Sequence, residues 1–333
     1  MEFRVYNENL IPTGTIHTFL SSVWQEKYCD RGICQLVVQD SKAAAQLLIP
    51  GSFIGKPGRK TLWQIKSKEK KDKQIWASGF TTNYTLLDDR IYDGIHQSNL
   101  VEEDLRAAVM EKRPAPIVGL GDLRNLDGTV VSEHTYPTLF ALSKDLCGSV
   151  DYGFRFLHDR KERKLLFDVW QGAQLPNAKF AEKFGNLANL ILQQSENGYK
   201  NVAYVSGQGE GAERIYITCG ETSSEGLSRH ELFVDARNIR KTDDQTQEEY
   251  EGLLVERGLQ KLNETNQKLS VTFDVNPNDF EKQYFLGDRI TCLLPEDGLK
   301  LFVRVIAFQE TIEDNKTTMQ ITVGTPIIQT IGG

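Results

Sequence analysis

The glycine-rich run Gly207-Gln-Gly-Glu-Gly211 has the composition of a phosphate-binding loop. Such a loop holds phosphate when it joins a strand to a helix N-terminus, because backbone N–H groups and the helix dipole then face the anion. Here a strand-like segment, residues 214–218, follows the glycines, and no lysine paired with serine or threonine closes the motif. The pattern therefore predicts a flexible β-hairpin rather than a nucleotide site.

Metal and hydrolytic chemistry need clustered side chains. The sequence contains no His-x-His, His-Glu-x-x-His or Gly-x-Ser-x-Gly motif, and its five histidines lie far apart, at His17, His96, His134, His158 and His230. Two carboxylates that converge in space could cleave a glycoside, but the acidic pairs at 88–89, 102–103 and 248–249 are typical of turns and helix N-termini. The sequence predicts no catalytic residue, no metal site and no cofactor.

The cysteines do not form a disulfide framework, because their number is odd and no Cys-x-x-Cys pair occurs. Cys219 and Cys292 lie inside apolar strand patterns, which predicts buried side chains, and Cys147 stands apart. Cys29 and Cys34 flank the turn 30–32 and could form a bridge under oxidation. We expect reduced thiols in a cytoplasm.

The composition bounds the class of protein. A chain of 333 residues with 39% hydrophobic residues predicts two or three folded domains. A net charge of −7 disfavours sequence-independent nucleic-acid binding. The basic run from Lys66 to Lys73 lies between two strand-like segments and predicts a solvated hairpin loop. We find neither a signal peptide nor an apolar run of about 18 residues, so we expect no membrane segment.

The hairpin at 283–308 is the best-defined element of the sequence. Ile290, Cys292 and Leu294 alternate on one strand, a Pro-Glu-Asp-Gly turn follows at 295–298, and Leu301 and Val303 begin the alternation of the next strand. Alternation with period two, interrupted by Asp-Gly, predicts a β-hairpin. The segment is typical of a small barrel and carries no chemistry.

Other elements follow from their apolar spacing. A helix is predicted at 101–112, a second one capped by Thr135 and running to about Cys147, and a third that opens with the capping box Thr246 and Glu249 and ends near 262. Residues 43–49 are an apolar stretch, and 154–157 with 164–170 predict another hairpin. We expect a mainly β fold with α+β insertions: an N-terminal β-barrel at 1–92, an α+β domain at 93–198, a second β-barrel from 199–225 and 283–333, and an α+β insertion at 226–282.

Several segments together resemble the tail hub proteins of tailed phages and prophages, in the siphovirus form of phages that infect Gram-positive bacteria. The matching segments are Arg4-Val5-Tyr6 through Trp24, Gly79-Phe80 with Leu87 to Ile91, Tyr152-Gly153-Phe154, Phe167 to Gly172, Phe184 to Leu187, Asn201 to Val205, Arg229 to Arg237, and Leu286-Gly287-Asp288. The resemblance implies two small β-barrels, the second interrupted by an α+β insertion. It also implies a homotrimer whose six barrels continue the tail tube as a ring.

The resemblance implies a non-enzymatic structural subunit that closes the distal end of the tube at the virion tail tip. Its expected partners are two further copies of itself, a distal tail protein, a tape-measure protein and the tip or receptor-binding proteins. Phage DNA would pass through without specific binding, and we hypothesise that acidic side chains line the lumen. The alternatives are a tail-tip cell-wall hydrolase and a receptor- or saccharide-binding adaptor.

Overall fold

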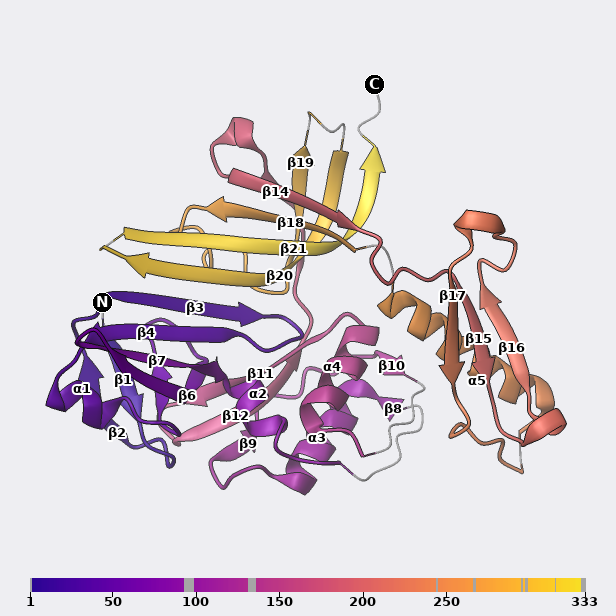
Figure 1. Cartoon of the computed structure of the whole chain (residues 1–333), viewed down its shortest axis with the longest axis horizontal. Helices are drawn as coiled ribbons and strands as arrows, with labels where there is room; N and C mark the ends of the chain where they lie inside the picture. Colours follow the sequence, from indigo (N-terminus) through magenta and orange to yellow (C-terminus); the bar gives the residue numbers. More distant parts are fainter. Residues whose placement is uncertain are drawn as a thin grey trace.

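The computed structural model describes residues 2–92, 99–130, 136–243, 245–265, 268–294, 296, 299–314 and 316–330. Figure 1 shows a broad body built on one large sheet, with a smaller unit projecting from it. Within the described residues the large sheet has 13 strands. Eleven of them follow the order β14-β18-β21-β20-β3-β4-β7-β6-β5-β1-β2, while β19 pairs with β20 and β13 pairs with β19. The mainly β fold is confirmed, and the path ends at β14 and β2 without closing, so two closed barrels stay a prediction.

The strands of this sheet come from both ends of the chain. They are β1 (Phe3–Tyr6), β2 (Pro12–Ile16), β3 (Ser21–Lys27), β4 (Ile33–Gln39), β5 (Phe53–Gly55), β6 (Leu62–Lys71), β7 (Gln74–Thr81), β13 (Gln174–Phe180), β14 (Ala188–Ser195), β18 (Lys268–Val275), β19 (Arg289–Leu294), β20 (Leu299–Glu313) and β21 (Lys316–Thr330). The halves join where β20 pairs with β3 over seven positions, from Ala307 opposite Lys27 to Glu313 opposite Ser21.

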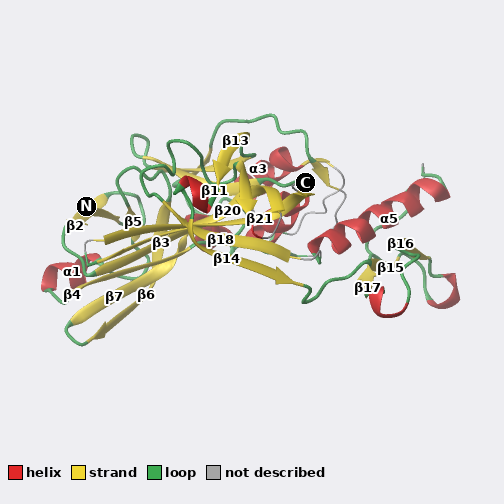
Figure 2. Ribbon diagram, turned by 90° about the horizontal axis from the view of Figure 1, so that it is seen from above, coloured by secondary structure: helices red, strands yellow, loops and turns green. Residues whose placement is uncertain are grey.

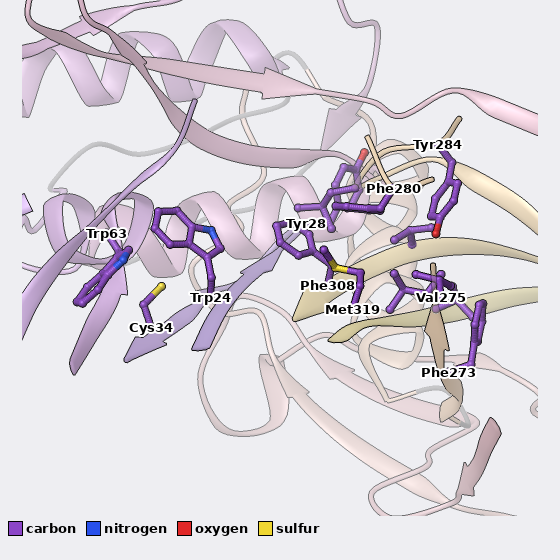
Figure 3. Packing of buried hydrophobic residues seen from close by; sticks show 14 of the residues in the cluster. Trp24, Tyr28, Cys34, Trp63, Phe273, Val275, Phe280, Tyr284, Phe308 and Met319 are labelled. Carbon is purple, nitrogen blue, oxygen red and sulfur yellow. The ribbon is translucent and has the colours of Figure 1, made fainter. Parts of the chain in front are cut away.

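The two halves also share a hydrophobic core. Figure 3 shows Trp24 and Trp63 from the N-terminal strands in one cluster with Phe273, Phe308 and Met319 from the C-terminal strands. The rings of Trp24 and Trp63 meet edge-on, with centroids 6.5 Å apart. Because aromatic side chains bury large apolar areas, this shared core makes the halves one packed body.

The predicted C-terminal hairpin is confirmed. Strands β19 and β20 pair in antiparallel register from Arg289 opposite Arg304 to Leu294 opposite Leu299. The apolar residues of the pattern are buried, including Ile290, Cys292, Leu301 and Val303. Three residues of the predicted turn, Pro295, Asp297 and Gly298, lie outside the described residues.

A middle unit packs three helices on a small sheet. Strands β11 (Gly153–Asp159), β12 (Lys164–Trp170) and β9 (Val118–Leu120) form the sheet, which confirms the predicted hairpin at 154–170. Helices α2 (Thr82–Leu87), α3 (Val101–Lys112) and α4 (Leu139–Ser149) share its core, and β8 (Asn99–Leu100) pairs with β10 (Thr129–Val130). Glu102, in the first turn of α3, is buried and accepts hydrogen bonds from the backbone of Arg124 and Leu126.

The projecting part, which we call the satellite unit (residues 199–265), has its own core. It contains β15 (Val202–Ser206), β16 (Tyr216–Gly220), β17 (Glu231–Asp235) and α5 (Gln247–Glu264), with the short turns η2 (Gly211–Glu213) and η3 (Gly226–Ser228). Figures 1 and 2 show α5 covering one face of the three strands. The predicted capping box of Thr246 and Glu249 is confirmed.

Three local expectations need correction. Residues 42–47 form a helix, α1 (Lys42–Leu47), because Ser41 caps it by accepting a hydrogen bond from Ala44. Helix α4 is capped by Thr138, and Thr135 lies outside the described residues. The basic run is mostly strand: β6 continues to Lys71, and the turn is only Asp72 and Lys73, both at positive φ.

The grouping of strands also differs from the expected one. Segment 202–206 pairs with 216–220 on one side and with β17 on the other, inside the satellite unit, and neither segment pairs with the C-terminal strands at 283–333. Strands β13 and β14, which we expected in the middle unit, join the large sheet through β19 and β18. Sheet partners this distant in sequence are chosen by tertiary packing, which the local apolar pattern does not encode. The division into separately folding domains stays a proposal.

His158 connects the middle unit to the N-terminal strands. Its backbone N–H donates to the Lys60 carbonyl at 2.6 Å, and its ring meets Tyr6 edge-on at 5.0 Å. Burial, with a smaller contribution from the charge of Arg160, lowers the pKa of His158 to about 4.

The folded chain should therefore lose stability as the pH falls. An unfolded histidine takes up a proton near pH 6.5, whereas the folded one stays neutral to about pH 4, so the free energy of unfolding should fall between these values. His158→Gln should flatten this part of the curve in urea titrations from pH 7.5 to 4. An unchanged slope in the variant would contradict the assignment.

Candidate functional site

The histidine, cysteine and acidic side chains that the structure describes do not gather into one site. The glycine-rich run forms the turn between β15 and β16, with Gly209 and Gly211 at positive φ, so the hairpin prediction is confirmed. No group of three histidine, cysteine or acidic side chains that could hold a metal ion occurs in the part of the chain that the structure describes. His96 and His134 lie outside that part.

None of the five cysteines forms a disulfide in the structure, and four of the five are buried. Burial raises the pKa of Cys29 and of Cys292 to about 12 in each case. Burial likewise raises the pKa of Cys34 and Cys147 well above the ordinary value. Because the thiolate is the reactive form of cysteine, these side chains are poor nucleophiles at neutral pH.

The most extensive feature is the side of the large sheet that faces away from the core, which we call the polar sheet face. Residues directly opposite each other in paired strands share a face, so the strand register defines its rows. The central row crosses β21, β20, β3, β4, β7 and β6 as Thr318, Thr311, Val23, Gln35, Ser78 and Ser67. All six side chains are at least partly exposed.

A second row consists of amides and one carboxylate. It crosses β18, β21, β20 and β3 as Asp274, Gln320, Gln309 and Gln25. Gln25 Nε2 donates to Gln309 Oε1 at 3.3 Å, and Gln320 Nε2 donates to Asp274 Oδ1 at 3.4 Å. The third row includes Lys316 opposite Glu313, so opposite charges offset each other at this margin. The face is therefore mainly hydrophilic and nearly uncharged over β18, β21, β20 and β3. On β4 and β7 the same face also carries Ile33, Trp76 and Phe80, which are at least partly exposed.

The core side of the same strands has the opposite character. Trp24, Leu36, Ile65 and Ala77 alternate with the polar residues and are at most 2% exposed. This alternation fixes the register, because a slip by one residue would bury glutamines and expose tryptophan. The sheet is thus a wall with one apolar surface and one largely polar surface.

The body and the middle unit are fixed to each other by a buried arginine. Arg304, on β20, is 1% exposed. Its Nε donates to Asp151 Oδ1 at 2.6 Å, and a second nitrogen donates to the Gly287 carbonyl. Arg289 also donates to Asp151, at 2.9 Å, so one carboxylate holds two guanidinium groups.

Close backbone contact surrounds this arginine. The ring of Tyr28 lies 5.1 Å from the Arg304 guanidinium carbon and meets Trp170 edge-on at 5.0 Å. A Cβ on Gly172 would come within 1.9 Å of the Gly287 carbonyl oxygen. We call these residues, Tyr28, Asp151, Trp170, Gly172, Gly287 and Arg304, the junction.

A second buried ion cluster ties β20 to the N-terminal strands. Lys56 and Glu310 form an ion pair with side chains 7% and 8% exposed, and Arg59 is paired with Glu281. Burial lowers the pKa of Lys56 and raises the pKa of Glu281, and in each case the opposite charges nearby offset part of the shift. The ring of Phe308 lies 4.4 Å from the Arg59 guanidinium.

The chain matches known proteins over nearly its full length. Residues 2–325 match the family described as Siphovirus ReqiPepy6 Gp37-like protein. The chain belongs to this family. The phage tail resemblance of the sequence is thereby confirmed, and the chain is a structural tail protein of the siphovirus type. No curated protein matches it.

Three solved tail proteins share the fold. Prophage tail protein gp18 from Listeria monocytogenes is 14% identical, with a TM-score of 0.62 over 98% of this chain and 94% of that one. The 43 kDa tail protein of prophage MuSo2 from Shewanella oneidensis is 11% identical, with a TM-score of 0.62 over 97% and 98%. The tail protein from Neisseria meningitidis is also 11% identical, with a TM-score of 0.60 over 97% and 96%.

Three of the eight segments that carried the resemblance contribute residues to the junction or lie next to it. Tyr152-Gly153, Trp170 to Gly172 and Leu286 to Asp288 all meet there. Ala173 N–H donates to Asp288 Oδ1 at 2.8 Å, which fixes the two segments in register. We did not predict the polar sheet face from the sequence, although glutamines at alternate strand positions indicate a polar side of the sheet. No described helix is long and apolar enough to cross a membrane.

Proposed function

We propose that the protein is the hub subunit of a siphovirus tail, and that three copies form a ring at the distal end of the tail tube. The polar sheet face carries this proposal. A wall that must let a polyanion slide past needs a wetted surface that offers neither cationic sites nor apolar patches. Glutamine and threonine side chains on β21, β20 and β3 supply most of such a surface, with Val23 as the apolar exception. Gln35, Ser78 and Ser67 continue it across β4, β7 and β6, beside the partly exposed Trp76 and Phe80.

The lumen chemistry proposed here is neutral rather than acidic. Uncharged amides and hydroxyls occupy the centre of the face, whereas most of its charges lie at the margins. The chain's net charge of −7 therefore need not be concentrated on this surface. The ring would contact a distal tail protein and a tape-measure protein, and it would connect the tube to tip or receptor-binding proteins at the virion tail tip.

Lysines on the polar sheet face should impede DNA passage. In phage particles carrying Gln25→Lys and Gln309→Lys, we expect normal tail assembly but DNA ejection slowed by about tenfold or more at low salt, because lysines bind phosphate. Higher salt should restore the rate. Gln171→Lys is the matched control, since Gln171 is exposed and lies outside the sheet. Equal ejection rates in both variants would refute the lumen assignment, and a monomer in assembled tails would refute the ring.

One observation favours the alternative role as a receptor- or saccharide-binding adaptor. On the side of the satellite sheet opposite α5, Tyr204, Tyr216 and Phe233 are 36%, 58% and 63% exposed. Exposed aromatic side chains are typical of interaction surfaces. Adsorption of the isolated protein to host cells, lost on Phe233→Ala, would support the adaptor role over the hub role.

A further inference from the structure

The N-terminal end of the large sheet carries a cationic pocket that the hub role does not use. It has a volume of about 720 Å³ and lies between strands β1 and β2 and the turn that joins β11 to β12. Its charged lining consists of Arg4, Arg160 and Arg163 against one acid, Glu2. Glu2 is already paired with Arg4 at 3.3 Å and lies 3.6 Å from His17.

Two of these arginines are uncommitted. Within the described part of the chain, the guanidinium groups of Arg160 and Arg163 make no hydrogen bond and no ion pair, and both side chains are exposed. Asp159, which precedes them in the chain, accepts the backbone N–H groups of Lys161 and Glu162 instead. The pocket is therefore built to receive negative charge, most of which the chain itself does not supply.

One wall of the same pocket is formed by β2, which is an edge strand of the sheet. Pro12, Thr13, Gly14 and Thr15 of β2 line it. Strand β2 is the last in the sheet order and pairs only with β1 among the described residues, so its outer edge has no strand partner. Figures 1 and 2 show β2 at the margin of the body. An open edge binds an extended polypeptide through main-chain hydrogen bonds.

We infer that this site binds an extended, acidic segment of a partner tail protein. The edge of β2 selects a polypeptide backbone, because its free main-chain groups can pair with another strand. The arginines select carboxylates. These carboxylates should lie at alternate positions of the bound peptide, because side chains on the same side of a strand recur at every second residue. Neither feature alone defines the ligand. Together they favour an acidic peptide over a free anion, which has no backbone, and over a neutral strand, which leaves the arginines unpaired.

The test uses the full chain and a fluorescent peptide, acetyl-Thr-Glu-Thr-Glu-Thr-Glu-Thr-amide, in polarisation titrations. We expect saturable binding that weakens with salt. Arg160→Ala with Arg163→Ala should lower the affinity at least about tenfold, whereas Arg240→Ala, at another exposed arginine, should not. Equal losses in both variants would overturn the site.

The backbone requirement has its own readout. Two peptides, N-methylated at the threonines or at the glutamates, block opposite edges of the strand. One should lose binding and the other retain it. If both bind as the parent does, or if inorganic phosphate competes as well as the peptide at equal concentration, the site is a general anion pocket and the inference fails. The assay needs only the isolated chain, so its failure would leave the trimeric ring untouched.

Discussion

Asp151→Asn should lower the free energy of unfolding by about 3 kcal/mol, because it leaves a buried arginine without its counter-charge. Arg304 is 1% exposed and directs two of its three nitrogens at this carboxylate. Asparagine keeps the shape and tolerates the positive φ of 60° at this position, so the change isolates the charge. An amide would also turn an N–H group toward guanidinium donors.

Urea unfolding of the wild type and variants measures this effect. Asp122→Asn is the matched control, because Asp122 is exposed, and it should change stability by less than about 0.5 kcal/mol. Adding Arg304→Met to Asp151→Asn should recover part of the loss, since replacing a buried ion pair with apolar groups is often tolerated. Equal stabilities for Asp151→Asn and Asp122→Asn would show that the junction does not stabilise the chain.

Gly172→Ala should destabilise the chain by about 3 kcal/mol through a backbone clash. The added methyl would meet the Gly287 carbonyl oxygen at 1.9 Å and the Asp288 nitrogen at 2.5 Å. These are backbone atoms, so no rotamer change can relieve the contact. The clash would separate the segments that hold Trp170 and Arg304 together.

Gly252→Ala adds the same methyl group but should raise the stability of the chain. Gly252 lies inside α5, and a Cβ there would meet no atom within 4 Å. Alanine is the better helix former, so stability should rise by about 0.5–1 kcal/mol. Unfolding midpoints of the two variants should therefore move in opposite directions. A neutral Gly172→Ala would show that the close approach at the junction is not required.

The chain's local patterns determined most of its elements. Alternation in 283–308 and 154–170 predicted both hairpins, and Thr246 with Glu249 predicted the start of α5. These predictions succeed because strand alternation and helix capping depend on residues a few positions apart. Local signals also misled: Ser41 capped a helix where we expected only an apolar stretch, and Lys66 to Lys71 continued a strand where charge suggested a loop.

Only the tertiary structure decided which strands pair and which surfaces result. The pairing of β20 with β3 joins residues 280 positions or more apart, and no local pattern specifies it. The polar sheet face exists because that pairing aligns Gln25 with Gln309 and Val23 with Thr311, and the pocket exists because the β11–β12 turn reaches β2. The sequence by itself determined that the strands have one apolar and one polar side, since alternation is local. Packing of the two halves on a shared core decided that the polar sides form one continuous face, because burial of Trp24 with Phe308 is a long-range gain.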